Sequence, residues 1–424
     1  MSDSQPFAGI RVVEFGQFVA VPFAAQLLAE GGAEVIKIEA LEGDPTRRLR
    51  PLAPGETRTF ISRNRGKHSL PLALSDPGAK PVIDALVEWA DVALMNFRPG
   101  SAERLGLDAA TLTARYPRLV IGTVTAFGPR GPESGHAGMD IVVQARSGLM
   151  AANGRTIDGR PAPGDPVSAD YMCAMSLAFG IGAALLRRER TGRGGTVDAS
   201  LMQAAMTLEN NQLVRSEPVD GPHHRAVLER LAAQRAAGAS YAEQADGMPS
   251  ARSLPLLKVY FRTYETADAP IAIACGSHSL RVRFREAVGF DDPGLEAMDD
   301  RDLGDHYDRL MSEVEARMRA TPSEEWLERL QRAGVPVSQV KFPIELFDDP
   351  QTAANAMFHT LEHPAVGDMT VLGPPVRLDS EGFAPAGPTA ALGSETDAIL
   401  ERLGFSATAI DGLVGAGVTR RGGS

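Results

Sequence analysis

The chain has 424 residues, of which 43% are hydrophobic and 23% charged, a composition typical of a globular protein with two domains rather than of a disordered or fibrous chain. Its formal net charge of −11 argues against nucleic acid as a partner, although a local cationic pocket for a polyphosphate is compatible with it. Two distant cysteines, Cys173 and Cys275, have neither disulfide nor ligand spacing and predict buried thiols and no metal site.

The first 130 residues alternate between strand and helix patterns. Strands are expected at residues 10–15, 33–39, 91–96 and 118–127, and helices at 22–31, 77–90 and 109–116. This alternation predicts an α/β fold, a Rossmann-like large domain whose mostly parallel sheet carries helices on both faces. The first turn, at residues 16–22, lacks the G-x-G-x-x-G fingerprint, which argues against a dinucleotide site.

A helix is expected at residues 171–186, where Ala, Gly, Ser, Met and Leu occupy nearly the whole circumference, so we expect it to be buried. About sixteen residues are too few to span a bilayer. The N-terminal residues also lack the basic and apolar regions of a signal peptide. The sequence therefore predicts no membrane partner and a cytoplasmic location.

The second half of the chain predicts three further segments. Residues 213–255 turn polar and are expected to form a linker with an added helix at 226–237. Residues 256–335 predict a smaller α+β domain, and residues 336–424 a return to the large domain, which begins at 1–212. The expected strands lie at 259–265, 270–275 and near Thr360 and Val371, and the expected helices at 277–288, 307–320, 323–333, 343–347, 395–403 and 407–414.

Asp170 stands where the helix at 171–186 begins. A carboxylate there lies among the unpaired N–H groups of the first turn, at the positive end of the helix dipole, so we expect it to stay ionised and to be able to act as a nucleophile. The alternative is an ordinary helix cap, since Asp is a common residue at this position.

Two further motifs accompany this helix, Asn96-Phe97-Arg98-Pro99-Gly100 and Arg63-Asn64-Arg65-Gly66-Lys67-His68-Ser69. Together the three segments resemble the family III CoA-transferases, the group that contains formyl-CoA transferase, carnitine CoA-transferase and α-methylacyl-CoA racemase. The resemblance implies transfer of CoA from an acyl-CoA to a small free carboxylic acid through an aspartyl-CoA thioester on Asp170. It also implies an interlocked homodimer, with acyl-CoA as substrate and no tightly bound cofactor.

Within this resemblance Asp140 is a second catalytic candidate, because family members carry an acidic residue facing the nucleophile; a cap or a solvated loop is an equal alternative. The N–H groups of Tyr171 and Met172 are expected to stabilise developing negative charge. Racemases of the family have His where this chain has Met139. Since a thioether cannot act as a base at neutral pH, an isomerase or racemase is disfavoured.

The resemblance places CoA binding in the first half of the chain. The first turn is expected to line the pantetheine end, and the cations of the two motifs are expected to hold the phosphates. The corresponding residues are Gln17, Phe18, Val19, Ala20, Arg65, Lys67, Asn96, Phe97, Arg98 and Arg104. The alternatives are an ordinary loop, surface cations and, for Phe97, a core side chain.

Four departures from the family pattern limit what the resemblance implies about substrates. The first turn has Gln17-Phe18-Val19 in place of His-Val-Gln, Ala40 replaces an arginine, residues 221–257 lack a glycine run, and residues 393–396 lack a His. A formyl or oxalyl substrate therefore does not follow. A non-catalytic protein that binds CoA esters is the alternative from another class, and a nicotinamide dehydrogenase has the least support.

Overall fold

The computed structural model describes residues 5–248, 254–296, 304–379 and 382–422. The chain forms two compact units, residues 1–213 with 353–424, and residues 214–352. Parts of the predicted linker, small domain and C-terminal return lie outside the described residues, at 249–253, 297–303, 380–381 and 423–424.

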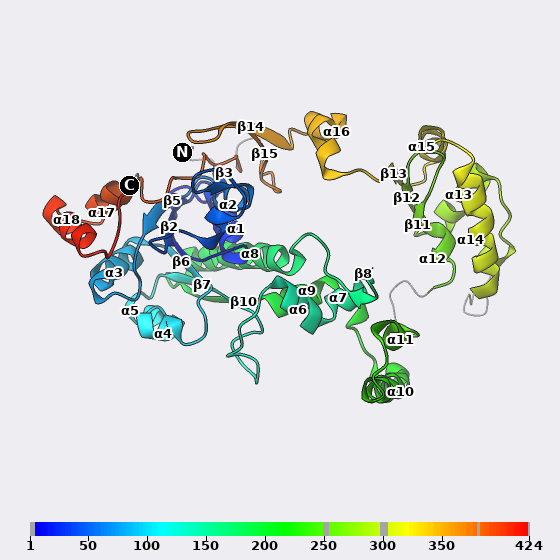
Figure 1. Ribbon diagram of the computed structural model, residues 1–424, viewed down its shortest axis with the longest axis horizontal. Coiled ribbons are helices and arrows are strands. Elements are labelled where there is room, and N and C mark those ends of the chain that lie inside the picture. Colours follow the sequence, from blue (N-terminus) through cyan, green and yellow to red (C-terminus); the bar gives the residue numbers. More distant parts are fainter. Residues whose placement is uncertain (1–4, 249–253, 297–303, 380–381, 423–424) are drawn as a thin grey trace. The chain divides into compact units, whose positions relative to one another are not determined.

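The first unit is built on a six-stranded sheet in which all neighbours are parallel (Figure 1). Its strands are β1 (Arg11–Phe15), β2 (Glu34–Glu39), β5 (His68–Pro71), β6 (Val92–Met95), β7 (Val120–Thr125) and β10 (Gly195–Ser200). They lie in the order β10-β7-β6-β1-β2-β5, which is the strand order of Rossmann-like sheets. The predicted α/β fold with a parallel sheet is confirmed, whereas β5 and β10 were not predicted.

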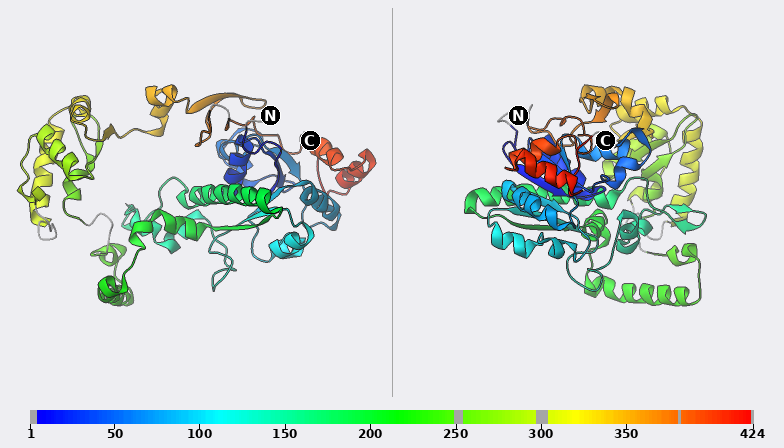
Figure 2. Two further views of the ribbon diagram at one scale, coloured as in Figure 1. Left: turned by 180° about the vertical axis from the view of Figure 1, so that it is seen from behind. Right: turned by 60° about the vertical axis from the view of Figure 1, so that its left-hand side comes forward.

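Alternate residues of each strand face two different cores. Val12 of β1 packs with α1, α8 and α9, while Val13 and Phe15 pack with α3, α5 and the C-terminal helices α17 and α18. Figure 2 shows the sheet between these groups of helices. The helices of this unit are α1 (Ala20–Glu30), α2 (Arg58–Asn64), α3 (Lys80–Trp89), α4 (Ser101–Leu105), α5 (Ala109–Arg115), α6 (Asp140–Ser147), α7 (Leu149–Ala152), α8 (Ser168–Thr191), α9 (Leu201–Leu208), α17 (Thr396–Arg402) and α18 (Ala407–Gly415).

Residues after 353 return to this unit, as the ion pairs and core contacts of α17 and α18 indicate. The expected strands near Thr360 and Val371 form an antiparallel hairpin. The tail then runs beside β5, where Thr419 forms a bridge with Leu72. The remaining strands pair within hairpins: β3 (Pro51–Ala53) with β4 (Glu56–Thr57), β8 (Thr156–Ile157) with β9 (Arg160–Pro161), and β14 (Phe358–His363) with β15 (Gly367–Leu372).

The second unit combines helices with a three-stranded antiparallel sheet. The predicted strand pair is present, with Phe261 opposite Ala274, and a third strand completes the sheet in the order β11-β12-β13. A separate core of aromatic and aliphatic side chains, including Tyr260 and Phe284, holds the sheet and helices together. The elements are α10 (Glu217–Ala236), α11 (Tyr241–Ala245), α12 (Leu257–Tyr260), β11 (Phe261–Tyr264), β12 (Ile271–Ala274), α13 (His278–Val288), α14 (Gly304–Arg319), α15 (Ser323–Arg332), β13 (Val337–Gln339) and α16 (Pro350–Ala354).

Helix α8 is longer and more exposed than the sequence predicted. It has 24 residues, and Met175, Phe179 and Leu186 are exposed, so it is not buried on all sides. Among the described residues, it is the one helix long and apolar enough to cross a membrane by length and composition, a test that core helices also pass. Its buried side packs closely on the sheet, because a Cβ added at Gly180 would lie 2.5 Å from Cγ1 of Val197 in β10.

Two glycines of α8 allow a test of this close approach. Gly182→Ala should raise the free energy of unfolding by about 0.5–1 kcal/mol, because alanine favours the helix and the nearest atom, Cζ of Phe7, lies 3.9 Å from the added Cβ. Gly180→Ala should lower it by about 1–2 kcal/mol, because the new methyl group overpacks against Val197. Urea unfolding of both variants checks this, and a stabilised Gly180→Ala would contradict the packing described.

Candidate functional site

Two buried lysines fix the turn that follows β1. Nζ of Lys37 lies 3.0 Å from the carboxylate of Glu14 and donates to the carbonyl of Gly16 at 2.8 Å. Nζ of Lys67 lies 2.7 Å from the same carboxylate and donates to the carbonyl of Pro22 at 2.7 Å. Both ends of the turn are therefore held by cations that share one buried anion.

The predicted role of Arg65 and Lys67 in binding phosphate needs correction. Arg65 is 4% exposed, and its Nη2 pairs with Glu30 at 2.8 Å and donates to the carbonyl of Leu372 at 2.9 Å. Lys67 is also 4% exposed, and burial lowers its pKa to about 8. Cations so enclosed and already paired hold the core together and leave no charge for a ligand.

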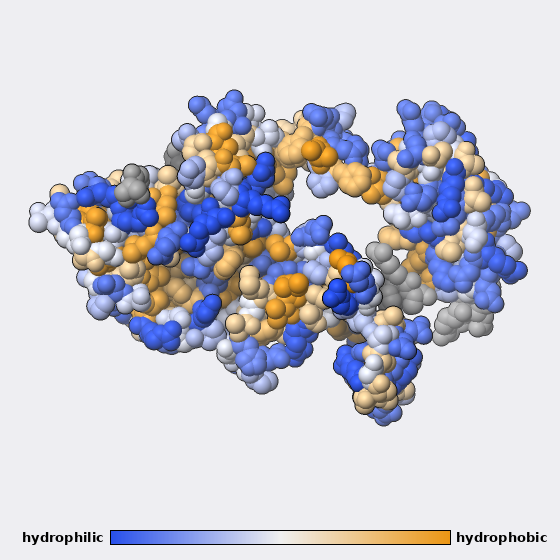
Figure 3. Space-filling view, in the orientation of Figure 1, coloured by the Kyte–Doolittle hydropathy of each residue, from blue (hydrophilic) through white to orange (hydrophobic). Residues whose placement is uncertain are grey.

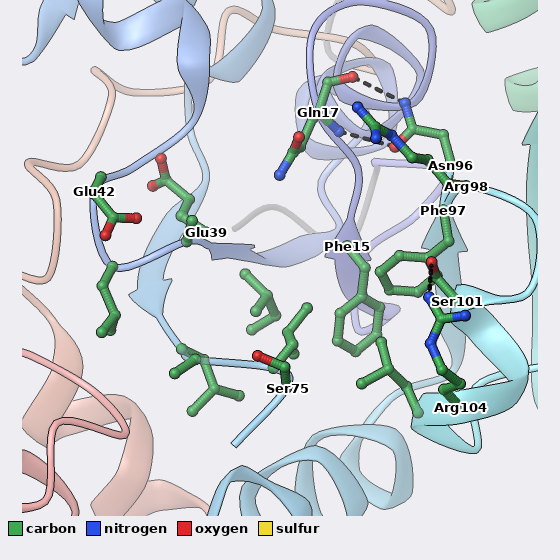
Figure 4. Close-up of a pocket in the computed structure, with 17 residues that line it drawn as sticks. Phe15, Gln17, Glu39, Glu42, Ser75, Asn96, Phe97, Arg98, Ser101 and Arg104 are labelled. Carbon is green, nitrogen blue, oxygen red and sulfur yellow. Dashed lines mark hydrogen bonds between the residues drawn. The ribbon is translucent and has the colours of Figure 1, made fainter. Parts of the chain in front are cut away.

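A cavity of about 680 Å³ opens at the carboxyl ends of β1 and β6, where the order of the strands reverses. Open α/β sheets commonly bind ligands at this switch point. Five of the predicted residues line it: Gln17, Asn96, Phe97, Arg98 and Arg104 (Figure 4). The amide of Asn96 pairs with the backbone of Gln17 in both directions, at 3.0 and 2.9 Å, and so joins the two loops.

Charges of opposite sign lie across this cavity. Arg98 and Arg104 are exposed, and neither has an ion-pair partner among the described residues; Arg104 donates to the hydroxyl of Ser101 at 2.8 Å. Figure 4 shows Glu39 and Glu42 on the opposite side. The ring of Phe97 lies 5.8 Å from that of Phe15. The wall can therefore offer two free guanidinium groups and an aromatic surface to one ligand.

The other residues of the first turn, which were predicted to line the pantetheine end, are not among the residues that line this cavity. Val19 and Ala20 are buried at 7% and 2% exposed, and Ala20 belongs to the core beneath α1. Phe18 is 38% exposed with a φ of 69°, and it is not among the residues that line the cavity. The turn thus presents Gln17 to the cavity and packs its last two residues inward.

Asp170 lies in the first turn of α8, as its third residue, because the helix begins at Ser168. Its backbone N–H donates to Oδ1 of Asp140 at 3.1 Å, so Asp140 supplies an acceptor that the helix end lacks. The carboxylate of Asp170 is partly buried, and no hydrogen bond or ion pair to it is present within the described ranges. Asp140, itself buried, also accepts from the side-chain amide of Gln144.

The prediction that Asp170 stays ionised because of its helix is corrected by its surroundings. Burial and the negative charge of Asp140 raise the pKa of Asp170 to about 7, although the guanidinium of Arg63 acts in the opposite direction. The helix dipole lowers the pKa of a carboxyl group in the first turn, but this effect is smaller than those of burial and of the charge of Asp140. Asp170 is consequently shared between its protonated and ionised forms at neutral pH.

One expectation about the groups near Asp170 changes, and one residue near it was not expected. The N–H of Tyr171 donates to the carbonyl of Val167 at 3.1 Å, so it is not free to stabilise an anion. Arg63, which no sequence argument singled out, donates from Nε to the hydroxyl of Tyr171 at 3.3 Å. The one feature of the sequence that could have drawn attention to Arg63 is its place at the start of the motif at residues 63–69.

The two cysteines are free and buried, as predicted. Burial raises the pKa of both thiols to about 12. Within the part of the chain that the structure describes, no cluster of three or more His, Cys, Asp or Glu side chains could hold a metal ion.

Comparison with known proteins gives one consistent result. The sequence profile of CoA-transferase family III matches residues 7–396. The acetyl-CoA:oxalate CoA-transferase of Acetobacter aceti is 31% identical over 83% of this chain and 85% of its own. The human succinyl-CoA:glutarate CoA-transferase is 28% identical over 99% of this chain and 91% of its own. The crystal structure of Rv3272 from Mycobacterium tuberculosis, 28% identical, has a TM-score of 0.74 over 93% of this chain and 99% of that one.

The raised pKa of Asp170 predicts a stability that depends on pH. Because the unfolded chain ionises this group near pH 4 and the folded protein only near pH 7, its ionisation costs stability as the pH rises through that window. Asp170→Asn should therefore gain on the order of 2 kcal/mol over the wild type at pH 8 and little at pH 4. Thermal unfolding across this range, with the exposed Asp165→Asn as control, checks it; equal stabilities at pH 8 would contradict it.

Proposed function

This chain belongs to CoA-transferase family III, and we propose that it moves CoA from an acyl-CoA donor to a free carboxylic acid through a thioester on Asp170. The observation that carries the proposal is the carboxylate of Asp170 itself. It is partly buried, free of hydrogen bonds to the described residues, and subject to the charges of a cation, Arg63, and of a second carboxylate, Asp140. A desolvated carboxylate of this kind is suited to nucleophilic attack.

In the proposed reaction an oxygen of Asp170 attacks the thioester carbonyl of the donor and expels CoA as a thiolate, which leaves a mixed anhydride. The thiolate then attacks the aspartyl carbonyl, releases the donor's acid and forms the aspartyl-CoA thioester. The acceptor acid attacks that thioester to give a second anhydride, and the thiolate takes the new acyl group. Asp170 is restored, and one difficult exchange is divided into easier ones.

A pKa of about 7 suits Asp170 to this role. Both protonation states are then populated at neutral pH, and a carboxylate that holds protons more tightly is a better nucleophile. Asp140 contributes in two ways: it orients the first turn of α8 through the N–H of Asp170, and its charge raises that pKa. We therefore assign Asp140 a positioning role rather than a covalent one.

CoA is proposed to bind in the cavity at the ends of β1 and β6. Arg98 and Arg104 are proposed to hold its phosphates, with Phe97 beside the adenosine. The turn that carries Gln17 leads directly into α1, where Phe23 packs against Tyr171 with ring centroids 4.9 Å apart. This chain of contacts joins the cavity to the residue that follows Asp170.

The named relatives act with oxalate and glutarate, so a small carboxylic acid is the proposed acceptor. Met139 precedes Asp140 and is 56% exposed. Because its thioether offers no base for an α-proton, the site supports transfer rather than racemisation.

The functional unit is proposed to be a homodimer. Met175, Phe179 and Leu186 form an exposed apolar face on α8, and Figure 3 shows apolar surface over α6 and α9 as well, where Ile141 and Val142 are exposed. Exposed apolar surface of this kind is typical of protein–protein contacts. A second copy of this chain is the proposed occupant.

Covalent trapping tests the role of Asp170. Incubation with an acyl-CoA donor followed by hydroxylamine or borohydride should modify Asp170, which peptide mapping by mass spectrometry would locate. Asp170→Ala should lower turnover by at least about 10³-fold, because the nucleophile is lost. Label on another residue, or undiminished turnover in this variant while Asp165→Ala behaves like the wild type, would reject the proposal.

The dimer is tested by size-exclusion chromatography with light scattering over a dilution series. If subunits interlock, the mass should remain that of a dimer of 45.0-kDa chains at every concentration at which the protein is still folded. A folded monomer that appears on dilution would argue against interlocking.

A further inference from the structure

Arg63 lies in the last turn of α2 and has few partners for an arginine that is partly buried. Nε donates to the hydroxyl of Tyr171 at 3.3 Å, and the guanidinium carbon lies 5.6 Å from the centre of the tyrosine ring. No carboxylate lies within ion-pair distance of it among the described residues. Its two terminal nitrogens, Nη1 and Nη2, make no hydrogen bond within the same residues.

The backbone that carries Arg63 is firmly held. Thr57 caps the start of α2 through the N–H of Phe60 at 2.9 Å, and Asn64 at its end donates to the carbonyl of Phe60 at 3.0 Å. The buried Lys67 donates to Asn64 in turn, at 2.9 Å. The guanidinium therefore projects from a fixed helix end and is anchored at Nε, which leaves the forked face of Nη1 and Nη2 unpaired.

The charge of this guanidinium acts on Asp170, next to Tyr171 in α8, and favours its ionised form. No direct ion pair joins Arg63 to Asp170 among the described residues, so the charge of Arg63 acts on Asp170 without pairing with it. A planar fork of two N–H donors matches the two oxygens of a carboxylate.

We propose that Arg63 binds the carboxylate of the acceptor acid and directs it toward Asp170 once Asp170 carries CoA. This inference rests on the proposed function and extends it to the residue that recognises the acceptor. The substrate class is any small acid whose reacting carboxylate can lie between Arg63 and the thioester carbon.

The order of charges explains why the acceptor enters second. In the free enzyme, Asp170 and Asp140 repel an incoming anion, and the ionised form of Asp170 offsets part of the attraction that Arg63 exerts on it. Formation of the thioester removes the charge of Asp170, so that Arg63 is left without a compensating anion on that side. An acceptor carboxylate restores the balance, which favours its binding to the thioester form over the free form.

The chemical step balances without any further reactant. One oxygen of the bound carboxylate forms a bond to the aspartyl carbonyl carbon, and the carbon–sulfur bond breaks with its electron pair going to CoA. The thiolate then bonds to the acceptor's carbonyl carbon, and the bond from that carbon to the anhydride oxygen breaks. That oxygen, which came from the acceptor, remains on Asp170, and no proton is gained or lost.

Measuring the two half-reactions separately tests whether Arg63 acts on the acceptor or on the donor. The first half-reaction forms the thioester on Asp170, and the second transfers CoA to the acceptor. Wild type, Arg63→Gln and Arg63→Lys are each mixed with an acyl-CoA donor, and labelling of Asp170 is followed by mass spectrometry before acceptor acid is added. Arg63→Gln should still label Asp170, whereas the acceptor concentration for half-maximal transfer should rise about 10- to 100-fold, the factor for loss of a charge-assisted pair. Arg63→Lys, which keeps the charge but loses the fork, should lie between the two.

A matched control is Arg58→Gln, since Arg58 is exposed, begins the same helix and lies on a different face from Arg63. It should match the wild type in both half-reactions. Labelling in Arg63→Gln should also need a higher pH, because Arg63 favours the ionised form of Asp170.

An unchanged acceptor requirement in Arg63→Gln would overturn the proposal, as would an equal rise in Arg58→Gln. Loss of labelling in both Arg63 variants, with native circular dichroism, would also overturn it by placing Arg63 in the donor step. Absence of label in the wild type would instead reject the aspartyl intermediate, and the assignment of Arg63 with it.

Discussion

The functional site depends on the ion pairs that Glu14 makes with Lys37 and Lys67 beneath the sheet's first turn. Four charges are removed from water, those of Glu14, the two lysines and Asp44, which pairs with Lys37 at 3.1 Å. This removal is costly, and a buried ion pair adds little net stability unless its remaining donors are satisfied. Here they are, since each lysine also donates to a carbonyl, one at Gly16 and one at Pro22. Loss of one partner would leave buried charge uncompensated, so the pairs fix the course of the backbone more than they add to the free energy of unfolding.

That fixed turn links the two parts of the site. On one side it presents Gln17, whose backbone is paired with Asn96 and which therefore brings the ends of β1 and β6 together. On the other side it starts α1, whose Phe23 packs against Tyr171 in the first turn of α8. The cavity and Asp170 are thus positioned by one short segment.

The parallel sheet could be predicted from the sequence because β1, β2 and β6 contain short stretches of strand-forming apolar residues, and helical patterns lie between them. β5 and β10 could not, since one is four residues long and ends in Pro71, and the other is polar and pairs along only one edge. The buried ion pair of Arg65 could not be predicted either, because its partner, Glu30, lies 35 residues away in the sequence. Motif position identified Asp170, but its protonation depends on Asp140, 30 residues earlier in the chain, and spacing does not reveal that contact.

Asp140 and Asp170 couple the stability of the protein to the reactivity that we propose for Asp170. The carboxylate of Asp140 accepts from the backbone N–H of Asp170, and the two carboxylates repel each other when both are ionised. Burial, together with this repulsion, raises the pKa of Asp170. In the proposed mechanism, acylation of Asp170 removes one of these charges and relieves the repulsion. The folded protein therefore bears a cost in its resting state that is released when the covalent intermediate forms, which shifts the equilibrium toward the thioester without any contact to the substrate. Arg63 limits that cost, because without its charge Asp170 would remain protonated to still higher pH and would be a nucleophile in a smaller fraction of molecules.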